Sequence, residues 1–360
     1  MKKALALLLG FAVAIGMAGC NDTKDAGADH SAAVLSASGG KEIQNTADDE
    51  DEMKTYYYVA PYMGHPYIYD QVLGFKYAAE QFQCKIVPLG PDGFDTQSAT
   101  EAFEQAVAKE PDGIITVMWD ESLVQAAKTA MDQGIPVIVI EAAPEEHGCL
   151  TYIGLDTYQY GWDMAEALID LEGSSGNLIV QGNWGSTNID EMLVGLKDCL
   201  SETGWKIVAE VNDDADTEKA IEGAKAALNN YDDIDAYVGL NSSSGPGIAV
   251  AMEELGMKPG EITVVAGARE DLVMEYIESG YIQVSICNKT AMQAYMAIAL
   301  LDLYYNEGYD LVPISSDNIS SGIRVFPEKI YTGTHVITGD NVESFKHENM
   351  GAYDTDLYVK

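Results

Sequence analysis

The feature that most constrains this chain is a regular alternation of two kinds of segment from Tyr56 onward. Short β-branched or aromatic runs alternate with segments of helical period. Between Ser98 and Lys109, for example, alanines, Phe103 and Val107 recur at intervals of three and four residues, which gives a helix one apolar stripe. Strands that alternate with such helices form a parallel sheet covered by helices. The sequence therefore predicts an α/β protein.

The alternation occurs twice, so we expect two similar lobes, each built on a doubly wound parallel sheet. The strands expected in the first half are 56–62, 85–89, 113–118, 136–140 and 151–154. Those expected in the second half are 177–181, 206–211, 236–240, 262–266 and 281–286. After Thr290 there remain one helix to about Asn306 and strand-like pieces at 323–326 and 334–337, so the tail must complete the existing lobes.

The N-terminal segment has the features of an export signal. Two lysines precede an almost uninterrupted apolar run, residues 4–18, which is too short for a comfortable membrane span. The tetrapeptide Met-Ala-Gly-Cys that ends at Cys20 resembles the cleavage motif of bacterial lipoproteins, in which the cysteine is lipidated. We therefore expect a lipid on Cys20. The alternative is a plain signal peptide with an incidental cysteine.

Residues 20–54 are rich in acidic and small side chains and contain no Phe, Tyr or Trp. Such a segment cannot bury enough apolar surface to fold, so it is expected to be a flexible tether behind the anchor.

The charge of the chain excludes one large class of partner. There are 20 Lys and Arg against 58 Asp and Glu, a formal net charge of −38. A nucleic-acid binder needs a basic surface, and an anionic membrane surface would repel this chain. Contact with the membrane is therefore expected only through the lipid.

Patterns of catalytic and metal-binding residues are absent from the sequence. There is no phosphate-binding loop, G-x-S-x-G, H-E-x-x-H or C-x-x-C, so nothing indicates an enzyme. The histidines lack metal spacing and the acidic runs lack the glycine of a calcium loop, so neither a metal nor a cofactor is expected. The cysteines after Cys20 show no disulfide framework and are expected to be reduced.

Eight short motifs occur in a specific order and spacing. They are VAPYMGHPY at 59–67, GIPVIVIE at 134–141, YIGLD at 152–156, QGN at 181–183, NID at 188–190, GLN at 239–241, VVAG at 264–267 and ESGY at 278–281. Together they resemble the type I periplasmic-binding proteins, especially the ribose-type sugar receptors of bacterial ABC importers. The resemblance covers about residues 55–345.

The resemblance implies the type I periplasmic-binding fold, with a ligand clamped between two lobes that are joined by a three-strand hinge. The chain would cross between the lobes near Leu155, near Asn288 and between Leu311 and Gly322. The resulting division is signal peptide 1–19, tether 20–54, first lobe 55–155 plus about 289–315, second lobe 156–288 plus about 316–345, and tail 346–360.

Polar and aromatic side chains follow the expected strands at their carboxyl ends, where doubly wound sheets bind ligands. The candidate ligand-binding residues are His65, Tyr67, Trp119, Asp120, Glu141, Asn183, Trp184, Asp190, Asn241, Arg269 and Asn288. The resemblance implies that Asn241 and Asn288 bind sugar hydroxyls, and that Glu141 replaces a ligand-binding aspartate.

Most of the candidates also have a purely structural alternative. Asn241, Asn288 and Glu141 could be turn residues whose side chains hydrogen-bond to their own backbone. The aromatic residues could belong to the core or to packing between the lobes, and the two aspartates could cap helices.

The chain departs from the ribose-type pattern at three positions. Ala142 and Asp190, or a neighbour of Asp190, stand where these receptors have arginines, and Ala268 stands where they have an aspartate. Losing guanidinium groups removes bidentate donors, so the ligand should offer more donors itself. Ribose is not expected, whereas a neutral sugar, a polyol or an amino sugar fits.

Two functions follow from this interpretation. The first is a monomeric, extracytoplasmic binding lipoprotein that hands a small polar solute, such as a monosaccharide, polyol or sugar derivative, to an ABC permease. The second is a ligand sensor whose closed form engages a receptor or histidine kinase without transport. In either case we expect the protein to be anchored at the surface of a Gram-positive-type cell rather than in a periplasm.

Overall fold

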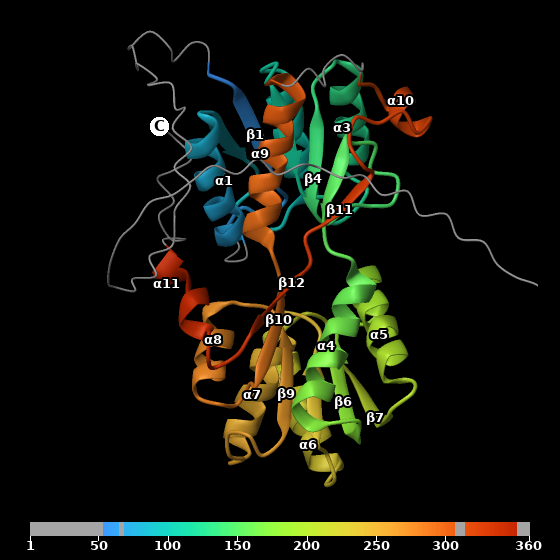
Figure 1. The fold of residues 1–360 in the computed structure, drawn as a ribbon, viewed down its shortest axis with the longest axis vertical. Helices are drawn as coiled ribbons and strands as arrows, with labels where there is room; N and C mark the ends of the chain where they lie inside the picture. Colours follow the sequence, from blue (N-terminus) through green and yellow to red (C-terminus); the bar gives the residue numbers. More distant parts are fainter. Residues whose placement is uncertain (1–52, 65–67, 307–313, 351–360) are drawn as a thin grey trace, which may run out of the picture. The chain divides into compact units, whose positions relative to one another are not determined.

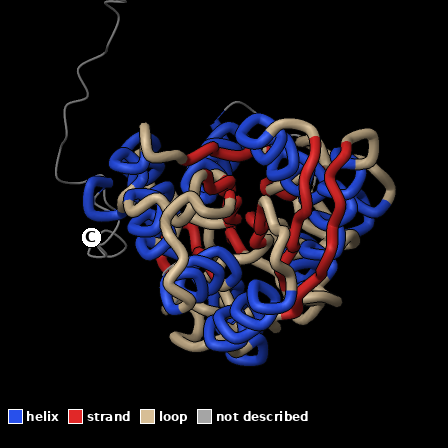
Figure 2. The backbone as a smooth tube through the Cα atoms, turned by 90° about the horizontal axis from the view of Figure 1, so that it is seen from below, coloured by secondary structure: helices blue, strands red, loops and turns tan. Residues whose placement is uncertain are grey.

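The predicted strands pair into two separate sheets of six strands each (Figure 1). The computed structural model describes residues 53–64, 68–306 and 314–350. In this part of the chain helices surround the strands of both sheets (Figure 2), which confirms the predicted α/β class. We call the unit around the first sheet the first lobe and the unit around the other sheet the second lobe.

The first lobe contains an all-parallel sheet with the order β11-β5-β4-β3-β1-β2. Its strands are β1 (Thr55–Val59), β2 (Lys85–Leu89), β3 (Gly113–Thr116), β4 (Val137–Glu141), β5 (Thr151–Gly154) and β11 (Lys329–Tyr331). Its helices are α1 (Ile68–Phe82), α2 (Thr96–Val107), α3 (Val124–Asp132), α9 (Thr290–Asn306) and α10 (Ser316–Ser320). Helix α1 packs against α9, and α2 packs against α3. Both faces of β4 are covered, so its first four residues are fully buried.

The second lobe repeats this plan with the order β12-β10-β9-β8-β6-β7, in which only β12 is antiparallel to its neighbour. Its strands are β6 (Ser175–Gly182), β7 (Gly204–Asn212), β8 (Ala236–Gly239), β9 (Thr263–Gly267), β10 (Val284–Asn288) and β12 (Thr334–Ile337). Its helices are α4 (Thr157–Glu172), α5 (Thr187–Leu200), α6 (Thr217–Asn230), α7 (Ser244–Glu254) and α8 (Asp271–Glu278). The 3-10 helix η3 (Val342–Phe345) and α11 (His347–Met350) follow β12.

The third crossing between the lobes lies later than expected. Helix α10 stays with the first lobe, because the backbone N–H and the hydroxyl of Ser316 donate to Asp132 at 2.8 and 3.0 Å. Strand β11 then pairs with β5, so the chain reaches the second lobe only through Thr332 and Gly333. Residues 316–331 therefore do not belong to the second lobe.

The strand expected at 323–326 does not form, and its place is taken by β11. Ile323 is 53% exposed, whereas Phe326 is buried in the core of the first lobe. Ile323 and Phe326 therefore belong to a loop, and this loop places only the side chain of Phe326 in the core of the first lobe.

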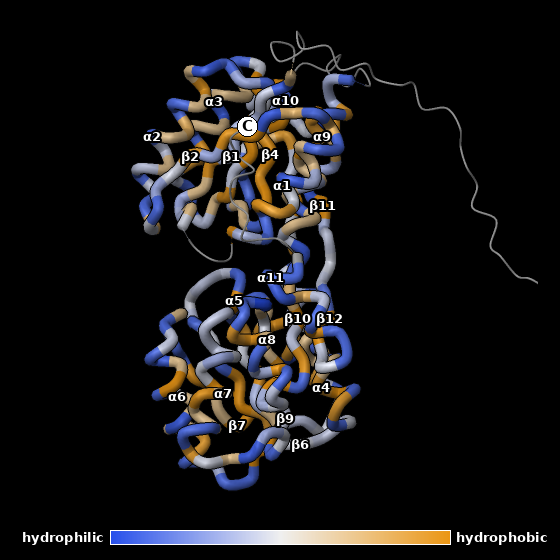
Figure 3. Tube along the Cα trace, turned by 90° about the vertical axis from the view of Figure 1, so that its left-hand side faces the viewer, coloured by the Kyte–Doolittle hydropathy of each residue, from blue (hydrophilic) through white to orange (hydrophobic). Residues whose placement is uncertain are grey.

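Hydrophobic residues concentrate on the strands and on the inner sides of the helices (Figure 3). Among the described residues no helix is long and apolar enough to cross a membrane. The four cysteines of this region, Cys84, Cys149, Cys199 and Cys287, are free thiols. The predicted signal peptide, the lipidated Cys20 and the predicted tether as far as residue 52 lie outside the described residues, as do His65 and Tyr67.

Helices α4 and α5 approach each other through two glycines. A Cβ atom at Gly161 would lie 1.8 Å from the carbonyl oxygen of Met192, and one at Gly195 would lie 2.0 Å from that of Tyr158. Because backbone atoms cannot move aside as a flexible side chain can, only glycine permits this approach.

We expect Gly161→Ala to lower the free energy of unfolding by about 1–3 kcal/mol, because overpacking outweighs the better helix propensity of alanine. Urea unfolding measures this change. Gly93→Ala is the matched control, since a Cβ atom there would meet nothing within 4 Å. Equal stability of the two variants would contradict the close packing of α4 on α5.

Candidate functional site

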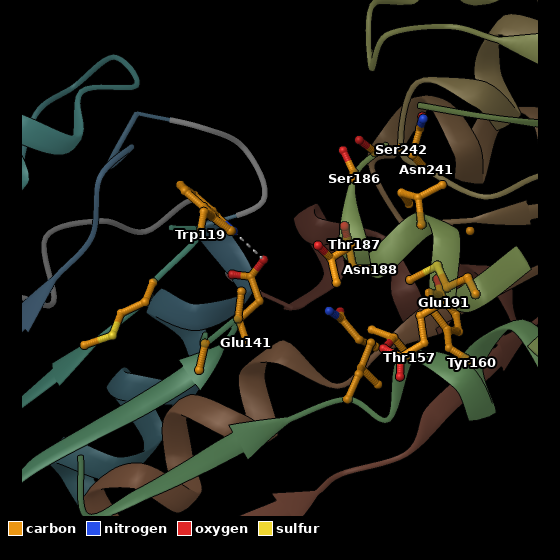
Figure 4. A pocket seen from close by; sticks show the side chains of 18 of the residues that line it. Trp119, Glu141, Thr157, Tyr160, Ser186, Thr187, Asn188, Glu191, Asn241 and Ser242 are labelled. Atoms are coloured by element: carbon orange, nitrogen blue, oxygen red, sulfur yellow. Dashed lines mark hydrogen bonds between the residues drawn. The ribbon is translucent and has the colours of Figure 1, made fainter. Parts of the chain in front are cut away.

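A pocket of about 1050 Å³ is lined by residues from both lobes, at the carboxyl ends of the strands. Trp119 follows β3 and Glu141 ends β4 in the first lobe, whereas Asn241 follows β8 and Asn288 ends β10 in the second. Trp119 and Glu141 face the labelled residues of the second lobe across an open space (Figure 4). This position agrees with the place predicted for a ligand.

Glu141 is the most constrained residue of the first-lobe wall. Its backbone has a positive φ of 67°, which is uncommon for a residue with a side chain. Gln71 donates to its Oε2 at 2.8 Å, the indole of Trp119 approaches its Oε1 at 3.4 Å, and the hydroxyl of Tyr152 donates to its carbonyl oxygen at 2.6 Å. Gln71 is itself fully buried and accepts a hydrogen bond from Tyr58. The Glu141 carboxylate is therefore held in place before any ligand binds.

The indole of Trp119 lies beside this carboxylate, and the ring of Phe94 lies beside the indole. Trp119 is 38% and Phe94 is 61% exposed, and their ring centroids are 5.9 Å apart. Both rings line the pocket. Exposed rings next to a carboxylate provide a flat apolar surface together with a hydrogen-bond acceptor.

The second-lobe wall is formed largely by the first turns of α4 and α5. The residues concerned are Asp156, Thr157, Ser186, Thr187, Asn188 and Glu191. None of these six residues is among the ligand-binding residues predicted from the sequence. The polar run that follows β6 and precedes the apolar stripe of α5 was the available signal, because the first turn after a parallel strand lies at the carboxyl edge of the sheet.

Asn241 lines the pocket, but the contacts of its amide are those of a turn residue. Its Nδ2 donates to Asp213 at 2.8 Å and to Asn183 at 3.2 Å, and its Oδ1 accepts the backbone N–H groups of Ser243 and Ser244, both at 2.9 Å. Asn241 therefore shapes the wall and orders the start of α7.

The candidate residues divide into three groups. Those that line the pocket are Trp119, Asp120, Glu141, Asn241, Arg269 and Asn288. Those that do not line it are Asn183, Trp184 and Asp190, and those outside the described residues are His65 and Tyr67.

The three residues away from the pocket have other roles. Asn183 donates to Ser186, Trp184 packs against the hydrophobic core under α4 and α5, and the Asp190 carboxylate accepts the Gly185 N–H at 3.1 Å. Asp120 accepts the Ser122 N–H at 2.8 Å, so it acts as a turn cap although it lines the pocket.

Arg269 forms a buried ion pair between the lobes. Its Nη2 lies 2.9 Å from Oδ1 of Asp70 on α1, and the two side chains are 10% and 8% exposed. His347 reaches the same oxygen with Nε2 at 3.2 Å and reaches Asp271 with Nδ1 at 3.0 Å. The hydroxyl of Thr290 lies 3.4 Å from the other oxygen of Asp70. The start of the predicted tail is thus part of the contact between the lobes.

Two buried histidines have pKa values shifted in opposite directions. Burial alone would lower the pKa of His347, but the hydrogen bond to Asp70 and its charge outweigh burial and raise this pKa above 6.5. For His147 burial dominates, with Arg324 adding to it, and lowers the pKa to about 4. His147 is therefore neutral near pH 7. Within the described residues no group of three or more side chains could hold a metal ion.

The comparisons with known proteins agree with this geometry. A sequence model of the periplasmic binding protein domain family matches residues 56–308. The chain belongs to this family. Periplasmic binding proteins bind solutes and are not enzymes, and the two doubly wound lobes confirm the type I periplasmic-binding fold that the motifs predicted.

Individual relatives are distant in sequence. The D-ribose/D-allose-binding protein of Pseudomonas aeruginosa is 25% identical over 215 residues, which are 58% of this chain and 67% of that protein. The arabinose-binding protein AraP of Geobacillus stearothermophilus superposes with a TM-score of 0.74 at 23% identity, over 81% of this chain and 99% of that one. A sugar-binding protein of a sugar ABC transporter from Bacillus halodurans has the same TM-score and coverage at 21% identity.

We expect His347→Gln to destabilise the protein more at mildly acidic pH than at alkaline pH. A raised folded-state pKa adds stability that is fully present below the unfolded value of about 6.5 and is lost as the pH rises through the folded value. Urea unfolding at several pH values measures the difference from the wild type.

The contrasting variant is His147→Gln. The lowered pKa means that the folded state favours the neutral histidine, so the wild type loses this stability as the pH falls from about 6.5 toward 4. The difference in the free energy of unfolding between His147→Gln and the wild type should therefore shrink over this range. If the difference in the free energy of unfolding between His347→Gln and the wild type does not change with pH, His347 adds no charge to the Asp70 ion pair.

Proposed function

We propose that this chain is the solute-binding lipoprotein of an ABC importer and that it captures a small polar solute between two closing lobes. The observation that carries the proposal is the pocket whose polar and aromatic lining is divided between the lobes. Sugars present hydroxyl edges and flat C–H faces, which match amides and carboxylates beside aromatic rings. The solute class is therefore a monosaccharide, a polyol or a related sugar derivative.

The names of the relatives support this class. Besides the ribose/allose-binding and arabinose-binding proteins, the similar structures include a solute-binding protein from Burkholderia graminis in complex with D-arabinose and one from Agrobacterium vitis bound with tagatopyranose. We infer that Trp119, Asp120, Glu141, Asn241, Arg269 and Asn288 contact or shape the site of the solute.

The mechanism that fits two half-sites is a population shift. Neither half encloses a solute alone, so a solute that touches both walls binds the closed state more tightly than the open state. A permease that recognises the closed surface would then discriminate loaded from empty protein.

A sensor is the second candidate function. Solved structures of XylFII in complex with LytSN have the same fold, with a TM-score of 0.63 at 22% identity for one of them. The fold thus also serves proteins that dock onto another protein. A sensor kinase encoded beside this chain without a permease would favour sensing, and an adjacent permease would favour import.

We expect one of the simple pentoses, hexoses or alditols to raise the melting temperature, because a solute at 100 times its dissociation constant adds about 2.7 kcal/mol. For the solute found, Trp119→Ala and Asn288→Ala should each weaken binding by about 1–3 kcal/mol in calorimetry. Glu104→Gln, which alters an exposed side chain of α2, is the control. Unchanged affinity in both pocket variants would place the site elsewhere.

We also propose that Cys20 is the lipidated N-terminus and that it anchors the protein outside the cytoplasm. Mass spectrometry of the protein from its own membranes should find diacylated Cys20 as the first residue, and Cys20→Ser protein should be released from the cells. A mature chain that begins at any other residue would disprove the anchor, whatever the solute.

A further inference from the structure

A chain of hydrogen bonds runs from the interior of the second lobe to the wall of the pocket. It begins at Asp213, which is fully buried directly after β7. It passes through the side chains of Asn241 and Asn183 and ends on the hydroxyl of Ser186. All four residues belong to the second lobe, so the chain is independent of how the two lobes meet.

The backbone fixes the orientation of the Asn241 amide. Its Oδ1 accepts the N–H groups of Ser243 and Ser244, both at 2.9 Å, and a backbone N–H can only donate. The two hydrogens on Nδ2 therefore point the other way, one to the Asp213 carboxylate at 2.8 Å and one to Oδ1 of Asn183 at 3.2 Å. Every hydrogen-bonding position of this amide is used, and none is left for a solute.

Asp213 holds the buried end of the chain. Its Oδ1 also accepts the Ala215 N–H at 3.0 Å, and its Oδ2 accepts the hydroxyl of Ser244. A carboxylate among such donors acts only as an acceptor. The Asn241 amide therefore cannot turn over without placing its oxygen against this carboxylate.

The same direction is passed on to Ser186. Because Oδ1 of Asn183 faces Asn241, its Nδ2 is the group that meets Ser186, and it donates to Oγ. This is the one hydrogen bond of that oxygen within residues 53–64, 68–306 and 314–350. Ser186 is the N-cap residue of α5, yet its side chain makes no capping hydrogen bond. It is partly exposed on the second-lobe wall of the pocket (Figure 4), so its hydroxyl hydrogen can reach an acceptor there.

We propose that Ser186 is a solute-binding residue that donates its hydroxyl hydrogen to an oxygen of the solute. Asn183, held in turn by Asn241 and Asp213, is the positioning residue that fixes the direction of this bond. This inference rests on the proposed function. A serine hydroxyl can otherwise donate or accept and does not discriminate between partners. Here Ser186 already accepts from Asn183, so the second lobe requires an acceptor at this point of the solute.

The test is calorimetry on the full mature protein with sugar analogues. D-ribose, D-arabinose, D-xylose, D-glucose and D-galactose are screened for a parent sugar that binds, and each of its non-anomeric hydroxyls is then replaced in turn by hydrogen and by fluorine. Fluorine can accept a hydrogen bond but cannot donate one, whereas hydrogen does neither. At one position the fluoro analogue should bind about threefold or more tightly than the deoxy analogue, as expected for one hydrogen bond.

Variants then assign this advantage to Ser186. Ser186→Ala should weaken binding of the parent sugar about three- to tenfold and should abolish the advantage of the fluoro analogue. Ser174→Ala is the matched control and should change neither quantity, since Ser174 is exposed and precedes β6 at the end opposite the pocket.

Asn183→Asp tests the direction of the chain. A carboxylate at position 183 would accept the Ser186 hydroxyl and leave only the oxygen of Ser186 to the solute. The parent sugar can still bind, because its own hydroxyl can donate instead, but the fluoro analogue should lose its advantage over the deoxy analogue.

A fluoro advantage that is absent from the wild type at every position, or that persists in Ser186→Ala, would overturn Ser186 as the donor and leave sugar binding standing. An advantage that persists in Asn183→Asp would overturn Asn183 as the positioning residue. Binding of none of the five sugars would count against both the donor and the proposed function. Circular dichroism checks that the variants fold, and the comparison of analogues on the wild type does not depend on them.

Discussion

The direction of the strands determines the position of most of the side chains that line the pocket. In a parallel sheet the chain must return along a helix after each strand, so all carboxyl ends lie at one edge. In this protein the two sheets bring those edges to the same pocket, where residues that follow β3, β4, β8, β9 and β10 meet. The polar character of these turns is compatible with folding only because each sheet has a separate apolar core that is complete without them.

The buried parallel strands were the most predictable part of the fold. The run at 151–154 coincides with β5, in which all four residues are buried. The run at 85–89 coincides with β2, although β2 lies at the edge of the sheet and only Ile86 of its residues is buried. Strand β11 was missed because it is three residues long, lies at the edge of its sheet and is half exposed. A short edge strand leaves no apolar run to recognise, so the third crossing was placed too early.

The site was predictable at the level of loops and much less so at the level of side chains. The position after a strand places Trp119, Glu141 and Asn288 correctly at the pocket. The same rule failed for Trp184, which turns into the core beneath α4 and α5. Local sequence also could not show that Arg269 is held by Asp70, because the partner lies in the other lobe and far away in the chain. Because of that ion pair, the positive charge of Arg269 is compensated within the protein.

The crossing from β11 to β12 restricts how the lobes can move. Only Thr332 and Gly333 separate Tyr331 in one sheet from Thr334 in the other, so these two strand ends can never be more than roughly 11 Å apart. The lobes can rotate about this short tie but cannot slide past each other or draw apart, and Gly333, with φ of 69°, supplies the backbone freedom for rotation. Any opening of the pocket would therefore have to be mainly a rotation about this tie, in which the displacement of a residue grows with its distance from the tie.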